Sequence, residues 1–269
     1  MPGAGGYDPE DDDLELDIEV RPAADIADRL VALAAVARRA FLESGLPADD
    51  EWDEDEDDPD DRPDDAETER YDLAAWLRDE GVDAALTAGE RSILATPIGA
   101  LDSDAAAGAS WAGESLVALA WGAGLLSELP PFDRPADSRA VLATLPEPWD
   151  KTTPLRSFIR PRSDEDAATG REIAELWYWR AGVEGVRRSS SPAEARELRA
   201  VIRETAEEAV AAGLLPRSVD GDFPAGRGPV SALSDAALDD LATLAAARLR
   251  ALNWLCGFGN DWDDVPLEL

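Results

Sequence analysis

The residues best able to do chemistry lie in three parts of the chain. Glu114 is the only charge in the apolar stretch 111–126, Arg180 and Arg248 lie among apolar residues farther along, and three carboxylates follow within 261–264. A carboxylate that is buried must be paired with a base or take up a proton. Facing guanidinium groups would therefore either neutralise Glu114 inside the core or build a polar site with it.

Two hypotheses stay open for these side chains. In the first, Glu114 forms a buried structural pair with Arg180 or Arg248. In the second, the polar residues converge on a solvent-open pocket and serve a ligand-binding protein or a hydrolytic enzyme. Burial with mutual pairing would favour the first hypothesis, and an open pocket the second. The candidate set for either is Glu114, Arg180, Arg248, Asn253, Asp261, Asp263 and Asp264.

The carboxylates of 261–264 have the oxygen chemistry that hard cations prefer. The calcium-loop pattern with its central glycine is absent, however, and an all-protein calcium site usually needs more oxygens. We favour the alternative, in which Trp262 and Val265 pack on the core while the acids cap the turn or meet Arg248 and Arg250. We therefore predict no metal site and no cofactor.

Composition excludes several catalytic classes. The chain has no His, so imidazole bases, Ser-His-Asp triads and His-ligated metals are absent. One cysteine, Cys256, cannot form a disulfide framework or a cysteine-cluster zinc site. The glycine-bearing stretch 220–229 follows no strand and precedes no Lys, so it matches neither a phosphate loop nor a dinucleotide fingerprint.

Tryptophans recur on the expected helices and predict an aromatic cluster in the core. Each buried indole N–H needs an acceptor, and Glu114 and Asn253 are candidates. The functional alternative is an aromatic ligand pocket with a polar floor of Glu114, Arg180 and Arg248. The tryptophans concerned are Trp111, Trp121, Trp177, Trp179, Trp254 and Trp262.

The negative charge is concentrated in two segments. The net charge of −34 includes −13 from residues 49–70 and −8 from residues 8–19, which leaves −13 on the other 235 residues. Like charges repel, so we predict a disordered acidic loop at 48–70. The acidity has two interpretations, adaptation to high cytoplasmic salt or mimicry of a polyanion that binds a basic partner. We favour salt adaptation, which the single Lys among 25 basic residues also fits.

Hydrophobic periodicity and capping signals predict an all-α fold of about eight helices. The central helix is the Ala-, Gly- and Trp-rich stretch 111–126, which is apolar on nearly every side. Pro-rich residues 147–162 predict an irregular connector. The expected helices cover 22–44, 71–80, 87–96, 111–126, 134–145, 163 onward, 191–213 and 234–256.

The domain organisation follows from these elements. Residues 1–20 form an acidic tail with one candidate strand at 13–20, where apolar and acidic residues alternate. This segment either lies extended over a groove of the domain, which we favour, or offers an edge strand to a partner. Residues 21–269 form a single all-α domain.

Several motifs resemble the bacterial family called domain of unknown function 4272. They are Trp111-Ala-Gly-Glu-Ser-Leu116, Ala120-Trp-Gly-Ala-Gly124, Ala247-Arg-Leu-Arg-Ala-Leu-Asn-Trp-Leu255 and Asp261-Trp-Asp-Asp-Val265, with weaker similarity at 27–33 and 89–94. The resemblance spans about 21–265 and implies a fold without a mechanism. The chain departs from the family pattern at Ala112, where an Arg is usual, and at Leu249, where a His is usual.

Taken together, these features predict a non-catalytic cytoplasmic protein that binds a macromolecule, with a basic protein as the candidate partner. A net charge of −34 opposes binding to nucleic acid and to anionic membranes, because both are polyanions. No apolar run is long enough for a transmembrane helix, and the first residues lack the pattern of a signal peptide. The alternative is the enzyme or ligand-binding protein built on the polar candidate set.

Overall fold

The computed structural model describes residues 18–45 and 62–267, and within these ranges the fold is helical, as predicted. The predicted acidic tail and residues 13–17 of the candidate strand lie outside the described residues, as does 48–61 of the predicted loop. The helices are α1 (Ala23–Ser44), α2 (Arg62–Asp79), α3 (Ala88–Ala95), α4 (Ser103–Gly122), α5 (Ser138–Leu142), α6 (Thr153–Phe158), α7 (Asp164–Ser189), α8 (Glu194–Ala211) and α9 (Asp235–Leu255).

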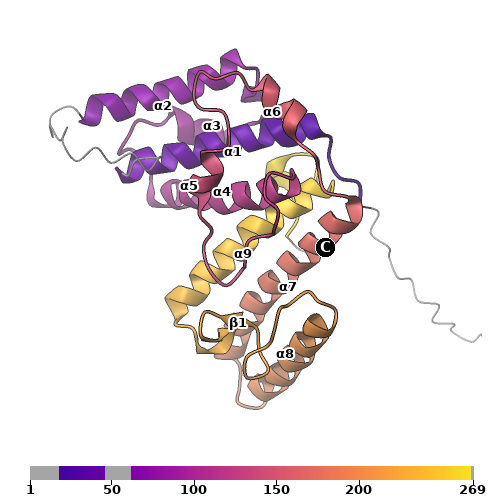
Figure 1. Cartoon of the computed structure of the whole chain (residues 1–269). Helices are drawn as coiled ribbons and strands as arrows, with labels where there is room; N and C mark the ends of the chain where they lie inside the picture. The colour runs from indigo at the N-terminus through magenta and orange to yellow at the C-terminus, as the bar shows by residue number, and fades with distance from the viewer. Residues whose placement is uncertain (1–17, 46–61, 268–269) are drawn as a thin grey trace, which may run out of the picture.

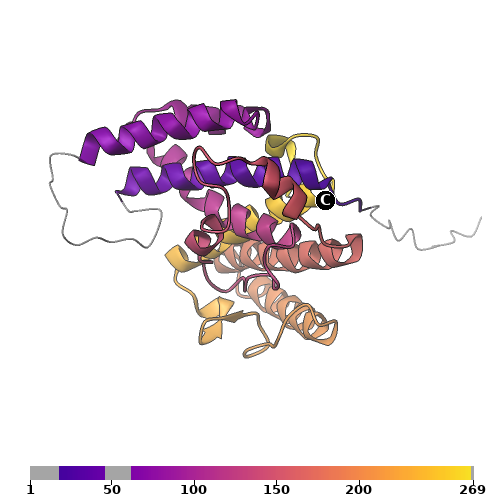
Figure 2. The ribbon, with the colours of Figure 1, turned by 45° about the horizontal axis from the view of Figure 1, so that its top comes forward.

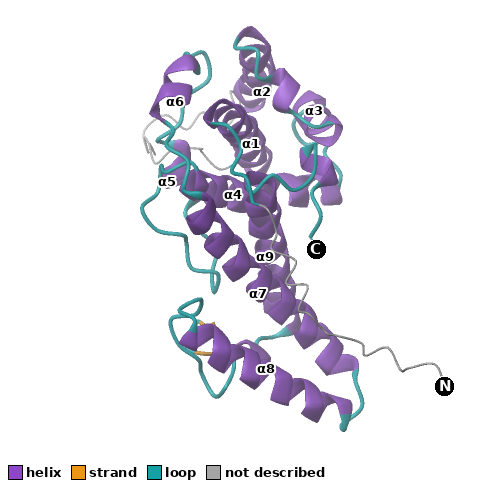
Figure 3. Ribbon diagram, turned by 90° about the vertical axis from the view of Figure 1, so that its right-hand side faces the viewer, coloured by secondary structure: helices purple, strands orange, loops and turns teal. Residues whose placement is uncertain are grey.

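Four long helices form the centre of the molecule. Helix α4 packs against α1 on one side and α9 on the other, and α9 packs in turn against α7 (Figure 1). Helices α2 and α3 cover α1, whereas α8 folds back on α7 at the opposite end (Figure 3). None of the described helices combines the length and the apolar composition that a membrane span requires.

The central helix begins earlier than the sequence indicates. Asp102 caps α4 by accepting a hydrogen bond from the backbone N–H of Ala105, so the helix starts eight residues before Trp111. From Gly113 to Gly122 every residue is buried, as the lack of a polar face predicts. Small residues let neighbouring elements approach closely: Gly170 of α7 faces the Trp121 indole, and a Cβ atom at Gly170 would lie 2.5 Å from it.

Helix α2 corrects the predicted extent of the acidic loop. The helix expected over 71–80 begins at Arg62, so residues 62–70 of the predicted loop are helical. Carboxylates near a helix N-terminus interact favourably with the helix dipole, which offsets their mutual repulsion. Glu67 also accepts hydrogen bonds from Arg70 and from the backbone N–H of Ile98, which ties α2 to the segment after α3.

Two further differences concern short elements. The Pro-rich connector contains α6, with Pro154 in its first turn, where proline is tolerated because that N–H has no helical partner. Helix α5 is shorter than the predicted 134–145, because Asp137 caps it directly. The only strands in the described residues are β1 (Pro224–Ala225) and β2 (Gly228–Pro229), which form a small ribbon beside α8.

Residues 18–20 are extended and pair with no strand within the described ranges, and they lie against the ends of α7 and α9 (Figure 2). The backbone N–H of Val20 donates to Asp164 at 3.0 Å, and the N–H of Arg21 donates to the carbonyl of Leu255 at 3.0 Å. Ile18 and Val20 pack on the core. These contacts hold residues 18–20 against the core, and both alternatives for the whole segment 13–20 stay predictions.

The close approach at Gly170 gives a first prediction. Gly170→Ala should destabilise the fold by about 1–3 kcal/mol, because the rigid Trp121 indole must shift to admit the methyl group. Gly185→Ala is the matched control on the same helix, since a Cβ atom there meets nothing within 4 Å. The control should gain about 0.5–1 kcal/mol from helix propensity. Urea unfolding of both variants measures this, and equal stabilisation by both would disprove the tight contact.

Candidate functional site

Glu114 and Arg248 form a buried ion pair between α4 and α9. The Glu114 Oε2 atom accepts hydrogen bonds from Arg248 Nε at 2.8 Å and Nη2 at 2.6 Å. Its Oε1 atom accepts one from the backbone N–H of Ala136 at 2.9 Å. Arg248 also donates to the carbonyls of Pro130 and Pro131. Of the two predicted partners for Glu114, Arg248 is therefore the one present.

This pair is built for structure. Arg248 is 0% exposed and Glu114 is 6% exposed, and each guanidinium contact joins α9 either to α4 or to the loop between α4 and α5. Burial lowers the pKa of Arg248, while the charge of Glu114 and its hydrogen bonds raise it in part. Each Glu114 oxygen accepts at least one hydrogen bond, and Glu114 also lines a cavity of about 360 Å³.

Arg180 belongs to a different buried network, at the α7–α8 end of the molecule. Its Nε and Nη2 atoms donate to the two oxygens of Asp222 at 2.6 and 2.8 Å, and Nη2 also donates to Glu184 at 3.1 Å. Glu184 in turn accepts from Arg187 and Arg188. The spacing of Arg180 and Glu184, four residues apart on one helix, is a signal that sequence reasoning missed.

Asp222 explains what this network does. Besides Arg180, its carboxylate accepts hydrogen bonds from the backbone N–H groups of Phe223 and Ser231. Burial on its own would raise the pKa of Asp222, but the hydrogen bonds and the charge of Arg180 outweigh burial and lower it. The glycine-bearing stretch that contains Asp222 is thus a loop fastened to α7 by an ion pair.

The remaining polar candidates lie elsewhere. Asn253 is buried, and its Nδ2 atom donates to the carbonyl of Pro266 at 2.7 Å. Trp262 and Val265 pack on the core as expected, and the acids of 261–264 are exposed. Neither of the two roles expected for these acids is present in the described residues: the Asp261 side chain does not cap the turn, and the acids do not pair with Arg248, which pairs with Glu114, or with Arg250.

The predicted polar candidates therefore do not share one site. Glu114 and Arg248 are together, Arg180 binds Asp222, and Asn253 and the 261–264 acids make separate contacts. Within residues 18–45 and 62–267, no three potential metal-ligating side chains of His, Cys, Asp or Glu are gathered at one point. The carboxylate–arginine pocket proposed for the enzyme hypothesis is not assembled.

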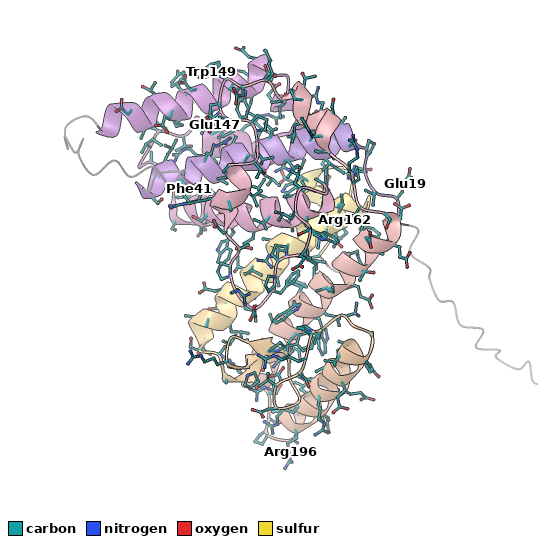
Figure 4. The ribbon with its side chains drawn as sticks, viewed as in Figure 1. Glu19, Phe41, Glu147, Trp149, Arg162 and Arg196 are labelled. Atoms are coloured by element: carbon teal, nitrogen blue, oxygen red, sulfur yellow. The ribbon has the colours of Figure 1, made fainter. Side chains whose placement is uncertain are left out.

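The tryptophans occupy several separate places in the core. Trp177 stacks on Phe132 at 6.1 Å between ring centroids and meets Phe223 edge-on at 5.4 Å, and the Trp179 ring lies 6.4 Å from that of Phe223. Trp254 and Trp262 contact each other at 5.9 Å. Trp121 lies under the guanidinium of Arg162, which Figure 4 labels, and Trp111 is only half-buried. No indole donates to Glu114 or Asn253 within the described residues.

Sequence reasoning also missed the arginines of α1. Arg29 forms a two-pronged pair with Glu90 of α3 and lies 4.2 Å from the Trp262 ring centroid. Arg39 donates to the carbonyls of Thr96 and Pro97. Both arginines interrupt the apolar stripe of α1, and that interruption was the available signal for buried ion pairing.

One cavity of the molecule has a volume of about 510 Å³. Its walls come from α1, α3, α4 and α9, and η3 (Trp262–Asp264) closes one side. A second cavity of about 360 Å³ shares Trp111 with the first as a lining residue. Ala112 lines the larger cavity, whereas Leu249 is buried in the core.

The comparison with protein families decides the identity. A family model described as "Domain of unknown function (DUF4272)" matches residues 13–206. The chain belongs to the DUF4272 family. The matched residues run from before α1 into α8, so the resemblance expected over 21–265 is confirmed as far as residue 206, and α9 with the 261–265 motif lies beyond the match. Searches of curated proteins and of solved structures found no match.

The Glu114–Arg248 pair gives a second prediction. Glu114→Gln should destabilise this DUF4272 protein by about 3–5 kcal/mol, because it leaves a buried guanidinium without its counter-charge. Adding Arg248→Met should recover part of that loss, whereas adding Arg180→Met should not. A double-mutant cycle by chemical unfolding measures the coupling. Equal coupling to both arginines, or none to Arg248, would contradict the pairing.

Asp222 gives a third prediction, which concerns pH. Because the folded-state pKa of Asp222 is lowered, its contribution is complete above the unfolded value of about 3.9 and is lost as pH falls through the folded value. Asp222→Asn should therefore reduce stability by about 3 kcal/mol at pH 7 and flatten the decline below pH ~4. Urea unfolding from pH 2 to 7 tests this. An unchanged acid slope in the variant would remove Asp222 as a contributor.

Proposed function

We propose that this DUF4272 protein is a non-catalytic binding module and that its partner is a basic protein. The observation that carries the proposal is the segregation of charge between interior and surface. Among the described residues, seven arginines are buried, but only four acids are. Positive charge is thus withdrawn from the surface, and the exposed face is more acidic than the composition alone implies. The buried arginines are Arg29, Arg38, Arg39, Arg70, Arg171, Arg180 and Arg248.

The buried arginines are engaged inside the protein. Arg70 donates to the carbonyls of Leu94 and Ala95, and Arg38 to those of Leu142 and Pro146. These guanidinium groups are unavailable to an acidic ligand. Exposed acids, by contrast, face solvent, where their field steers a positively charged partner toward the surface.

We propose that the partner contacts α2 and the acidic residues that precede it in the sequence. Residues 49–61 carry eleven carboxylates and no base, and they lead directly into α2. Asp65 and Asp79 continue the charge as exposed residues of α2, and Tyr71 adds an aromatic ring that is 64% exposed. Acidic and aromatic side chains together suit an arginine-rich partner surface.

We also propose a cytoplasmic setting. The single thiol, Cys256, is buried, and burial raises its pKa to about 12, so it is protonated and unreactive at neutral pH. A protein with one inert thiol is suited to a reducing compartment. Adaptation to high salt remains the competing account of the acidity, and the experiment below separates the two.

The test is capture from a lysate of the source cells with two charge variants of the full chain. One replaces the eleven acids of 49–61 by Asn or Gln, and the control does the same for the eight acids of 8–19. The proposal expects a captured protein of positive net charge that KCl releases, that the first variant loses and that the control keeps. Capture that is unaffected by the first variant would contradict the proposal. Absence of any captured basic protein would favour salt adaptation.

A further inference from the structure

The cavity of about 510 Å³ has walls suited to an apolar ligand. Its volume lies within the range of about 300–1,000 Å³ that is typical of small-molecule sites. One wall is the α9 face of Thr243, Ala246, Ala247 and Arg250, where small side chains leave the helix surface open. The facing wall includes Gly108 of α4, at which a Cβ atom would meet nothing within 4 Å.

Three charged residues line this cavity, and they differ in whether another described residue pairs with them. The Glu90 carboxylate pairs with Arg29 and accepts a hydrogen bond from the backbone N–H of Thr87. Arg250 is half-buried, and neither a hydrogen bond nor an ion pair joins its guanidinium to another described residue. Asp263, on η3, is exposed and likewise has no side-chain partner in the described part of the chain. One free cation and one free anion therefore face the same space without pairing.

We propose that this cavity binds a small zwitterion with an apolar body, namely an amino acid or short peptide with a free ammonium and a free carboxylate. Arg250 receives the carboxylate, for which a guanidinium offers paired donors, and Asp263 receives the ammonium. The apolar body lies against Ile93, Trp111 and Ala112. This site is independent of the proposed basic protein partner.

The overall charge favours a zwitterion over a simple ion. A protein of net charge −34 repels an organic anion at long range, and Arg250 would have to offset that field alone. An organic cation would be attracted by the field but would meet the Arg250 guanidinium inside the cavity. A zwitterion has no net charge, and it is the class that uses both unpaired groups.

The test uses the full chain and isothermal titration with matched probes. They are the dipeptide leucyl-phenylalanine, its N-acetyl form, its C-terminal amide, and free phenylalanine. The dipeptide should bind about tenfold more tightly than either blocked form, because each blocked form lacks one charge-assisted contact. Free phenylalanine distinguishes an amino-acid site from a short-peptide site. If phenylalanine binds more tightly than the dipeptide, the ligand is an amino acid; if it binds more weakly, the ligand is a short peptide.

Substitutions assign the contacts. Arg250→Gln should make the dipeptide and its amide bind equally, and Asp263→Asn should make the dipeptide and its N-acetyl form bind equally. Gly108→Leu should abolish binding by filling the cavity while retaining the melting temperature, since its Cβ points into open space. Gly185→Leu is the matched control, a helical glycine outside the cavity with equally open surroundings, and it should bind like the parent.

Three results would overturn the inference. The first is no binding of the dipeptide or of phenylalanine at millimolar concentration. The second is a blocked form that binds as tightly as the dipeptide, which would indicate an anion or cation site. The third is unchanged binding by a folded Gly108→Leu variant, which would place the ligand elsewhere. These results do not bear on the basic-partner proposal, because its test alters only acids of 49–61 and 8–19 and leaves Arg250 and Asp263 unchanged.

Discussion

The fold depends on buried guanidinium groups. They hold loops against the helices at places where apolar packing between helices does not reach. Arg248 joins α4, α9 and the loop at 130–136, and Arg180 holds the loop around Asp222 against α7. Loops of this kind have few apolar residues to bury, so their carbonyls and carboxylates must be satisfied by donors from the helices. Removing one partner of such a pair leaves an uncompensated charge, which is why each pair constrains its surroundings.

The same constraint shapes the charge of the surface. Arginines that are buried cannot neutralise the exposed acids, so the surface is more negative than the composition alone implies. Arg250 is an exception on α9, two residues after Arg248 and on the cavity side. The two proposals therefore rest on different chemistry: the basic-partner proposal on the exposed acids, and the ligand proposal on a cavity lined by Arg250 and Asp263.

Much of the fold was predictable from local signals. Thr87 and Glu90 form a reciprocal capping box at the start of α3, where the sequence predicted a helix over 87–96, and Ser163 caps α7 at the predicted start. A charge on an apolar helix likewise predicted that Glu114 would be buried and paired. Local patterns could not show that Arg180 would pair with Asp222, which is forty-two residues away in the sequence, and not with Glu114. The start of α2 was predicted too late. Repulsion among the acids favoured a disordered loop, but carboxylates near a helix N-terminus also interact favourably with the helix dipole, and that interaction was left out.

The ion pairs that fasten the loops, Glu114–Arg248 and Arg180–Asp222, are buried, whereas only four of the described acids are buried in all, so repulsion acts mainly at the surface. Thermal unfolding of the full chain between low and molar KCl tests this arrangement of charges most directly, because salt screens exposed charges far more than buried ones. The account predicts that the melting temperature rises with KCl, as surface repulsion is screened while pairs such as Glu114–Arg248 persist. A melting temperature that falls with KCl would contradict it, because the interactions that hold the fold would then have to be exposed ion pairs.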